Sequence, residues 1–93
     1  KNYVYICSKS SNEPMPEIFR FFGFSFFFYS KEHDPIHVHV EGKDGFAKFE
    51  YDGERFNLRE SHGIKAGDLK KIQFVIDDNA DIIVARWNEH FNR

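Results

Sequence analysis

The stretch His33-Asp34-Pro35-Ile36-His37-Val38-His39-Val40 begins the most regular part of the chain. Pro35 fixes its own φ and disfavours the α region for the residue before it, so the chain is extended or turning where it enters His37. Successive side chains of a strand then point to opposite faces. The two valines therefore share one face, and His37 and His39 share the other. The stretch predicts a half-buried strand with an apolar face and an imidazole face.

Two turns extend this strand into a meander. Asp52-Gly53 lies between two alternating segments, and a two-residue type I′ turn favours such a pair because both of its central positions need positive φ. A further turn at residues 42–45 pairs residues 37–41 with residues 46–50. The expected register after Asp52-Gly53 places these residues opposite each other: Tyr51 and Glu54, Glu50 and Arg55, Phe49 and Phe56, Lys48 and Asn57, Ala47 and Leu58.

Loop length decides which side chains share a face of this sheet. An even loop at residues 42–45 keeps the alternation in phase, whereas an odd loop with a bulge would break it. In the even case the core face carries Val38, Val40, Ala47, Phe49, Phe56 and Leu58. The opposite face then carries His37, His39, Lys48, Glu50, Arg55 and Asn57.

The segment before the histidines is dense in aromatic residues, which favour strands. It predicts one strand from Ile18 to Phe22 and another from Phe24 to Tyr29, with a bend or bulge at Gly23. The second of these strands is apolar on both faces, so it is central or exposed to a partner. Residues Tyr3 to Cys7 are also β-prone, and two interpretations stay open for them: an added edge strand, or a lead-in that orders only in an oligomer.

Beyond Gly63 the apolar period changes from two to about 3.6, which predicts helices. One helix is expected from Ala66 to Asp77 and another from Ala80 to Phe91, because Asp77-Asp78-Asn79 interrupts the pattern and offers an N-cap. The fold class is therefore α+β, an antiparallel meander of about five strands with both C-terminal helices packed on one face. Residues 1–14 are expected to form an N-terminal extension, and residues 15–93 a single domain.

Composition narrows the partners and the compartment. The chain has a net charge of -2 without a basic face, so nucleic acid binding is unsupported. It has a single cysteine, Cys7, and no apolar run long enough for a bilayer, so a reducing cytoplasm is expected and a membrane is not. Twelve Phe, four Tyr and one Trp are hard to cover in so short a chain, which favours a homo-oligomer or a protein partner.

The histidines are the candidate chemistry. His37 and His39 could aim both rings at one metal ion, with further ligands from a set that comprises His33, Glu41, Glu50 and His62. A zinc site needs three or four protein ligands, and the strand supplies two with a common facing, so neither a metal nor another cofactor is expected. Glu50 near His37 could instead raise the pKa of the imidazole and orient it for acid–base catalysis. The other interpretation is a polar strand face with hydrogen-bonded histidines.

Arginines offer a second candidate site. Arg20, Arg55 and Arg59 could bind a phosphate or carboxylate in bidentate fashion. Arg20 is the most distinctive, because it interrupts an aromatic run. The alternative to ligand binding by Arg20 and Arg55 is an arginine that stacks on rings and extends to solvent.

These motifs resemble a bacterial family of short proteins, domain-of-unknown-function family 4160. The resemblance rests on Met15-Pro16-Glu17-Ile18, Arg20-Phe21-Phe22-Gly23, Phe28-Tyr29, the segment His33 to Val40, and Trp87 in the last helix. Members usually begin near the position of Met15, and Ile36 stands where a second proline is common. The resemblance implies a small α+β protein, often found beside another small gene in an arrangement like that of toxin and antitoxin, or carried on mobile elements. It implies no established catalytic residues.

Two classes of function follow. The first, which we favour, is a non-enzymatic interaction or regulatory module that binds itself or a small protein encoded by a neighbouring gene. The second is a small hydrolase or nuclease, metal-assisted or not, that uses His33, His37 and His39 with Glu50. Complex formation with a neighbouring gene product favours the first, and metal-dependent turnover of RNA or a phosphoester favours the second.

Overall fold

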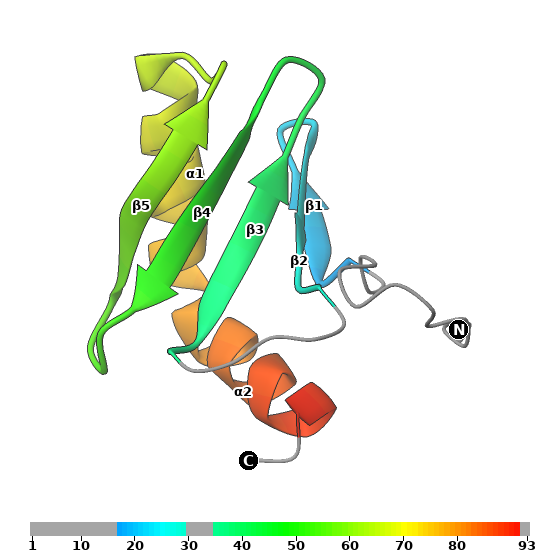
Figure 1. Cartoon of the computed structure of the whole chain (residues 1–93), viewed down its shortest axis with the longest axis vertical. Helices are drawn as coiled ribbons and strands as arrows, with labels where there is room; N and C mark the ends of the chain where they lie inside the picture. Colours follow the sequence, from blue (N-terminus) through cyan, green and yellow to red (C-terminus); the bar gives the residue numbers. More distant parts are fainter. Residues whose placement is uncertain (1–16, 30–34, 92–93) are drawn as a thin grey trace.

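The computed structural model describes residues 17–29 and 35–91. Its strands form one antiparallel sheet in the order β1-β2-β3-β4-β5, and two helices follow (Figure 1). This confirms the predicted α+β meander. The elements are β1 (Phe19–Phe21), β2 (Phe24–Phe27), β3 (His37–Glu41), β4 (Phe46–Tyr51), β5 (Phe56–His62), α1 (Ala66–Asp78) and α2 (Ala80–Phe91). The N-terminal extension and the edge strand considered for Tyr3 to Cys7 lie outside the described residues.

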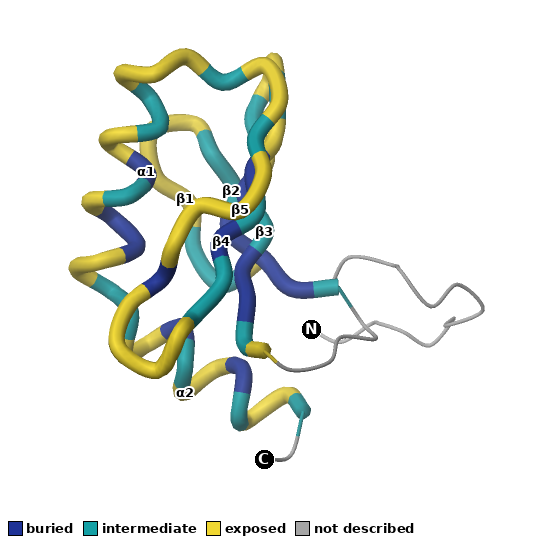
Figure 2. The backbone as a smooth tube through the Cα atoms, turned by 60° about the vertical axis from the view of Figure 1, so that its left-hand side comes forward, coloured by how far each residue is buried: buried dark blue, intermediate teal, exposed yellow. Residues whose placement is uncertain are grey.

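Both helices lie on one side of the sheet, and their buried segments face it (Figures 1 and 2). The apolar period of the sequence predicted their bounds to within one residue. Asn79 separates them: its backbone N–H donates to the carbonyl of Val75 at 3.0 Å, and its own carbonyl accepts the first bond of α2 from Ile83 at 3.0 Å. Among residues 17–29 and 35–91, no helix has the length and apolar character needed to cross a membrane.

The core fills the space between the sheet and the helices. The even loop at residues 42–45 keeps β3 and β4 in phase, with Val40 opposite Ala47 and Val38 opposite Phe49. The predicted core-face residues are buried with one exception, Leu58, which is 42% exposed on the edge strand β5 beside a bulge. The largest fully buried side chains are Trp87, Phe26, Phe28, Phe49, Phe56, Ile72, Ile76, Ile83, Val38 and Val40.

The β1–β2 connection is tighter than the predicted bend or bulge at Gly23. Phe21 pairs with Phe24, so Phe22 and Gly23 form a two-residue hairpin turn. Both residues have positive φ, 53° and 80°, as a type I′ turn requires. Glycine accepts this conformation without cost, but an aromatic residue at positive φ is uncommon. The turn therefore keeps the Phe22 ring, which is 61% exposed, at the end of the hairpin.

The register between β4 and β5 differs from the expected one. Tyr51 pairs with Phe56 and Glu50 with Asn57, so the connection is a four-residue loop and the two-residue turn at Asp52-Gly53 was wrong. Asp52 explains the longer loop, since its carboxylate accepts hydrogen bonds from the backbone N–H groups of Glu54 at 2.8 Å and Arg55 at 2.9 Å. From Phe49 to Tyr51 the shift is two residues, which preserves the facing of side chains, and beyond the bulge between Lys48 and Phe49 it is three.

This arrangement makes Asp52 a source of acid sensitivity. The backbone N–H groups of Arg55 and Glu54 and the side-chain amide of Asn57 hold the pKa of the Asp52 carboxyl below its ordinary value of 3.8. A carboxyl whose pKa is lower in the folded state stabilises the fold above its unfolded pKa, and this stabilisation is lost as the pH falls through the folded pKa.

Asp52→Asn should therefore be less stable than wild type at neutral pH, and the difference should shrink under acid conditions because both chains then carry a neutral side chain. Urea unfolding at about pH 7 and about pH 2 measures this difference. Glu54→Gln, in the same loop, is the matched control. A stability difference for Asp52→Asn that stays constant across this range would contradict the assignment.

Candidate functional site

His37 occupies the start of β3, opposite Glu50 on β4. Its Nδ1 donates a hydrogen bond to the backbone carbonyl of Pro35 at 2.8 Å, which fixes the proton on Nδ1 in the neutral ring and leaves Nε2 as the acceptor. The residue is only 7% exposed, and its ring lies 5.2 Å from that of Trp87 on α2. Position on the outer face of a strand did not predict this burial, to which the Trp87 ring on α2 contributes.

His39 lies in an aromatic cluster on the face of the sheet that the helices leave uncovered. Its ring stacks on Phe27 with 5.7 Å between centroids and meets the edge of Tyr29 at 4.4 Å. The His37 ring is 5.1 Å away. We call Phe27, Tyr29, His37 and His39 the aromatic–histidine cluster. The common facing of the two histidines agrees with strand alternation, whereas their packing against Phe27 and Tyr29 follows from the β2–β3 register, which the sequence did not predict.

Glu50 is engaged by two cations. Its carboxylate lies 3.3 Å from Nε of Arg59 and 3.8 Å from Nζ of Lys48. The predicted cross-strand pair with Arg55 was wrong, because the register is shifted and Arg55 pairs with Asp77 on α1 at 3.3 Å. Glu50 is opposite His37 in the register, but these cations neutralise its charge.

The described residues do not assemble a metal centre. No group of three or more His, Cys, Asp or Glu side chains within residues 17–29 and 35–91 could hold an ion. His62 accounts for part of this result, since it lies on β5, which β4 separates from β3. Its Nε2 pairs with Glu60 at 3.1 Å, and its ring packs against Phe46. His33, the remaining candidate ligand and catalytic residue, lies outside the described residues, so the site that would include it stays a prediction.

The two candidate ligand-binding arginines lie at opposite edges of the sheet and do not form one site. Arg20 on β1 makes a bidentate pair with Glu17, with Nη2 2.7 Å from Oε2 and Nε 3.3 Å from Oε1. The Ser25 hydroxyl donates to the same carboxylate at 3.0 Å. These hydrogen bonds, that of Arg20 first, lower the pKa of Glu17. The prediction was that Arg20 binds a carboxylate or phosphate of a ligand. In the structure, Glu17 of the same chain supplies the carboxylate.

A shallow hollow adjoins the aromatic–histidine cluster. It has a volume of about 240 Å³. Phe46 at the start of β4 contributes to its wall and is 46% exposed. Phe46 was not among the predicted site residues, although strand alternation from Ala47 places it on this face. The lining residues are Phe27, Tyr29, His39, Val40, Glu41, Phe46 and Ala47.

Comparison with known proteins identifies the family. A family model described as "Domain of unknown function (DUF4160)" matches residues 23–88. The match runs from the β1–β2 turn through Trp87 and contains both histidines of the cluster, whereas the Met15-to-Ile18 part of the resemblance precedes it. Comparisons with curated proteins and with solved structures give no match. Because the family model covers well over half of the sequence, this chain belongs to the DUF4160 family.

Proposed function

We propose that this DUF4160 protein is a non-enzymatic interaction module of toxin–antitoxin or mobile-element type, which binds a small protein partner through the helix-free face of its sheet. The observation that carries the proposal is the exposed Phe46 beside the half-buried rings of Tyr29 and His39, which rest on the buried Phe27. Partly exposed aromatic side chains are typical of protein interfaces, because a flat ring buries a large area at a small entropic cost.

The charges around the cluster support binding. Lys48, Glu50 and Arg59 form ion pairs on the strands next to it, with the Arg59 side chain 61% exposed. An apolar centre with a charged rim is the usual anatomy of a protein–protein interface. Exposed ion pairs contribute little to the stability of the fold. We therefore assign these charges a role in orienting the partner.

The packing of His39 favours binding over acid–base catalysis. Its ring is in contact with the face of Phe27 and with Tyr29, and such contacts hold an imidazole as a packing group. His37 has Nδ1 committed to a backbone carbonyl and is almost buried. Both rings are thus held in place by packing, with His39 half-buried and His37 almost buried.

The experiment is co-expression of the full chain with the product of the neighbouring gene, followed by size-exclusion chromatography with light scattering. Phe46→Ser should weaken the complex by about five- to thirtyfold, since loss of one central aromatic contact costs on the order of 1–2 kcal/mol. Phe74→Ser is the matched control, because Phe74 is 68% exposed but lies on α1, behind the sheet. Its complex should be unchanged.

Equal weakening by both substitutions, or a complex indifferent to Phe46→Ser, would contradict this interface. A homodimer of the isolated chain that Phe46→Ser dissociates would assign the same face to a second copy in place of a different protein. Circular dichroism of each variant establishes that the fold is retained before binding is compared.

A further inference from the structure

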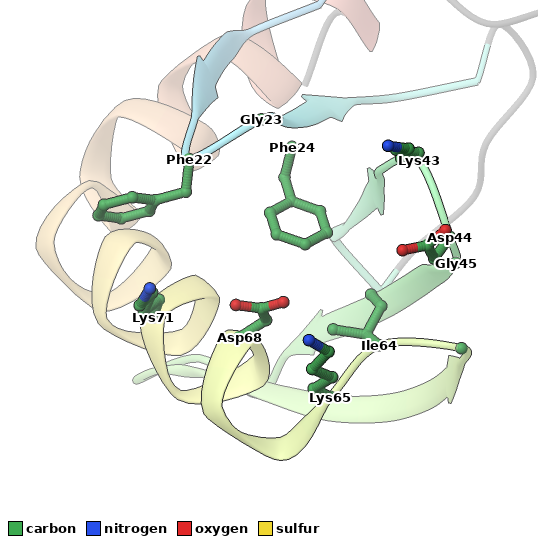
Figure 3. Close-up of a pocket in the computed structure, with 11 residues that line it drawn as sticks. Phe22, Gly23, Phe24, Lys43, Asp44, Gly45, Ile64, Lys65, Asp68 and Lys71 are labelled. Carbon is green, nitrogen blue, oxygen red and sulfur yellow. The ribbon is translucent and has the colours of Figure 1, made fainter.

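A second cavity, separate from the aromatic–histidine cluster, lies between the β1–β2 turn, the β3–β4 loop and the start of α1 (Figure 3). Its volume is about 340 Å³, within the range of roughly 300–1,000 Å³ that small-molecule sites occupy. The three segments are distant in sequence, so the cavity exists only in the folded chain. Neither the family description nor the proposed interface assigns it a role.

Close backbone packing forms one wall of this cavity. A Cβ atom on Gly45 would collide with the carbonyl oxygen of His62, and one on Gly63 would collide with that of Asp44. The β3–β4 loop therefore lies directly on the connection between β5 and α1. Gly42 is similar, since a Cβ there would collide with the ring of Phe24. These contacts fix the wall before any ligand binds, which lowers the entropic cost of binding.

The apolar part of the cavity is aromatic. The Phe24 ring points into the space, and the Phe22 ring lies at its margin (Figure 3). Phe22 is the one described residue other than glycine with positive φ, and it is 61% exposed, so neither backbone preference nor core packing explains an aromatic side chain there. Strained and exposed residues of this kind are concentrated at binding sites.

The polar part of the cavity carries more positive than negative charge. Lys43, Lys65 and Lys71 line it together with Asp44 and Asp68. None of the ion pairs found among the described residues involves these five side chains. Lys71 lies instead 5.5 Å from the centroid of the Phe22 ring, a cation–π distance. The lysines are therefore available to an anion without first breaking an internal ion pair.

We propose that this cavity binds a small aromatic anion, with a flat ring against Phe22 and Phe24 and a phosphate or carboxylate group near Lys43 and Lys65. Ring stacking and charge neutralisation by lysine act on different parts of such a ligand, so neither part alone should bind well. Asp68 points into the same space (Figure 3) and opposes the anion, which sets the affinity below what three lysines alone would give.

Calorimetric titration of the full chain with phenyl phosphate tests the proposal. Inorganic phosphate and phenol supply the separate parts, and benzoate distinguishes a carboxylate from a phosphate. Phenyl phosphate or benzoate should bind at least about tenfold more tightly than inorganic phosphate and than phenol, a difference of about 1.4 kcal/mol. Binding of inorganic phosphate as tight as that of phenyl phosphate, or no binding of either aromatic anion at millimolar concentration, would overturn the proposal.

Charge variants give effects of opposite sign within one cavity. Lys65→Gln should weaken binding of phenyl phosphate by about fivefold or more, whereas Asp68→Asn should strengthen it, because one change removes an attraction and the other a repulsion. Lys70→Gln is the matched control, since Lys70 is exposed on α1 but does not line the cavity. A loss with Lys70→Gln equal to that with Lys65→Gln would mean non-specific attraction and would overturn the site.

Phe22→Asn separates binding from stability. It creates the Asn-Gly pair that type I′ turns prefer, so the melting temperature should rise by a few degrees. The same change removes the ring from the margin of the cavity, and affinity for phenyl phosphate should fall by about fivefold. Unchanged affinity in the stabilised variant would show that Phe22 has no part in binding and would overturn the proposed arrangement.

Discussion

Trp87→Ala is expected to lower the free energy of unfolding by about 3–5 kcal/mol, the usual cost of removing a large buried aromatic side chain. Trp87 is fully buried. Its ring meets that of Phe28 edge-on at 5.2 Å and lies 4.5 Å from that of Phe91. A domain of this size has a total free energy of unfolding of roughly 5–15 kcal/mol, so this variant should be close to unfolded.

Trp87→Phe should cost much less than the lost volume suggests. The indole Nε1 is buried and has no hydrogen-bond partner among the residues that the structure describes. A buried unsatisfied donor costs about 1–3 kcal/mol, and phenylalanine removes that penalty while it keeps most of the aromatic contact. We therefore expect Trp87→Phe to lie within about 1 kcal/mol of wild type, because the smaller cavity and the relieved donor oppose each other.

Urea unfolding followed by far-ultraviolet circular dichroism compares these variants, since the chain has one tryptophan and the substitutions remove its fluorescence. Ile82→Ala is the matched control on the same helix, where the side chain is 44% exposed. It should change stability by under about 0.5 kcal/mol. A Trp87→Phe variant as unstable as Trp87→Ala would refute the role assigned to the unpaired indole donor.

The helices were the most predictable part of the fold. Their apolar stripes and the break at Asp77-Asp78-Asn79 are local features of the sequence, and both helices have the expected bounds to within one residue. Which side chains face the core was also predictable. An even loop keeps the alternation of two paired strands in phase, and a register shift of two residues does not change it. Leu58 was the exception, since the bulge beside it interrupts the pairing of the edge strand.

Register and turn type were less predictable, because side chains compete with the backbone for hydrogen bonds. Asp52 accepts hydrogen bonds from two loop N–H groups and so favours a longer turn than the two-residue turn that the Asp52-Gly53 pair predicted. At the other hairpin, Phe22 occupies a position where turn preferences favour asparagine, so the type I′ geometry was not expected.

The candidate site was predictable only where one strand determines it. His37 and His39 lie on one strand, and their common facing followed from alternation. Their neighbours Phe27 and Tyr29 come from a preceding segment that no short turn motif joins to β3. The cavity at the start of α1 was not predicted, because its walls come from three segments whose meeting depends on backbone contacts between glycines.

The backbone contacts of Gly63 predict a second large loss of stability, for the variant Gly63→Ala. Gly63 has φ of 76°, and an added Cβ would collide with the carbonyl oxygen of Asp44 and lie 3.2 Å from the Cα of Gly45. The atoms in its way belong to backbone and cannot rotate aside as a side chain would. The substitution should therefore cost about 3 kcal/mol or more, the sum of left-handed strain and a displaced loop.

Two other glycines separate these contributions. Gly53 has φ of 102° with nothing within 4 Å of an added Cβ, so Gly53→Ala should show strain alone, about 1–2 kcal/mol. Gly45 is not among the positive-φ residues, but its added Cβ would collide with the carbonyl oxygen of His62, so Gly45→Ala should show the steric contribution alone. Gly67→Ala, in open space within α1, should be neutral or slightly stabilising.

Urea midpoints of the four variants test this separation, and the Gly45→Ala, Gly63→Ala double variant tests its cause. If the two glycines share one backbone contact, the first substitution displaces the loop and the second then adds less than its separate cost. Additive losses would mean that the contacts at Gly45 and Gly63 are independent. A loss for Gly63→Ala no larger than that for Gly53→Ala would mean that the β3–β4 loop yields to an added methyl group, and the wall of the cavity would then be adaptable where the structure implies that it is fixed.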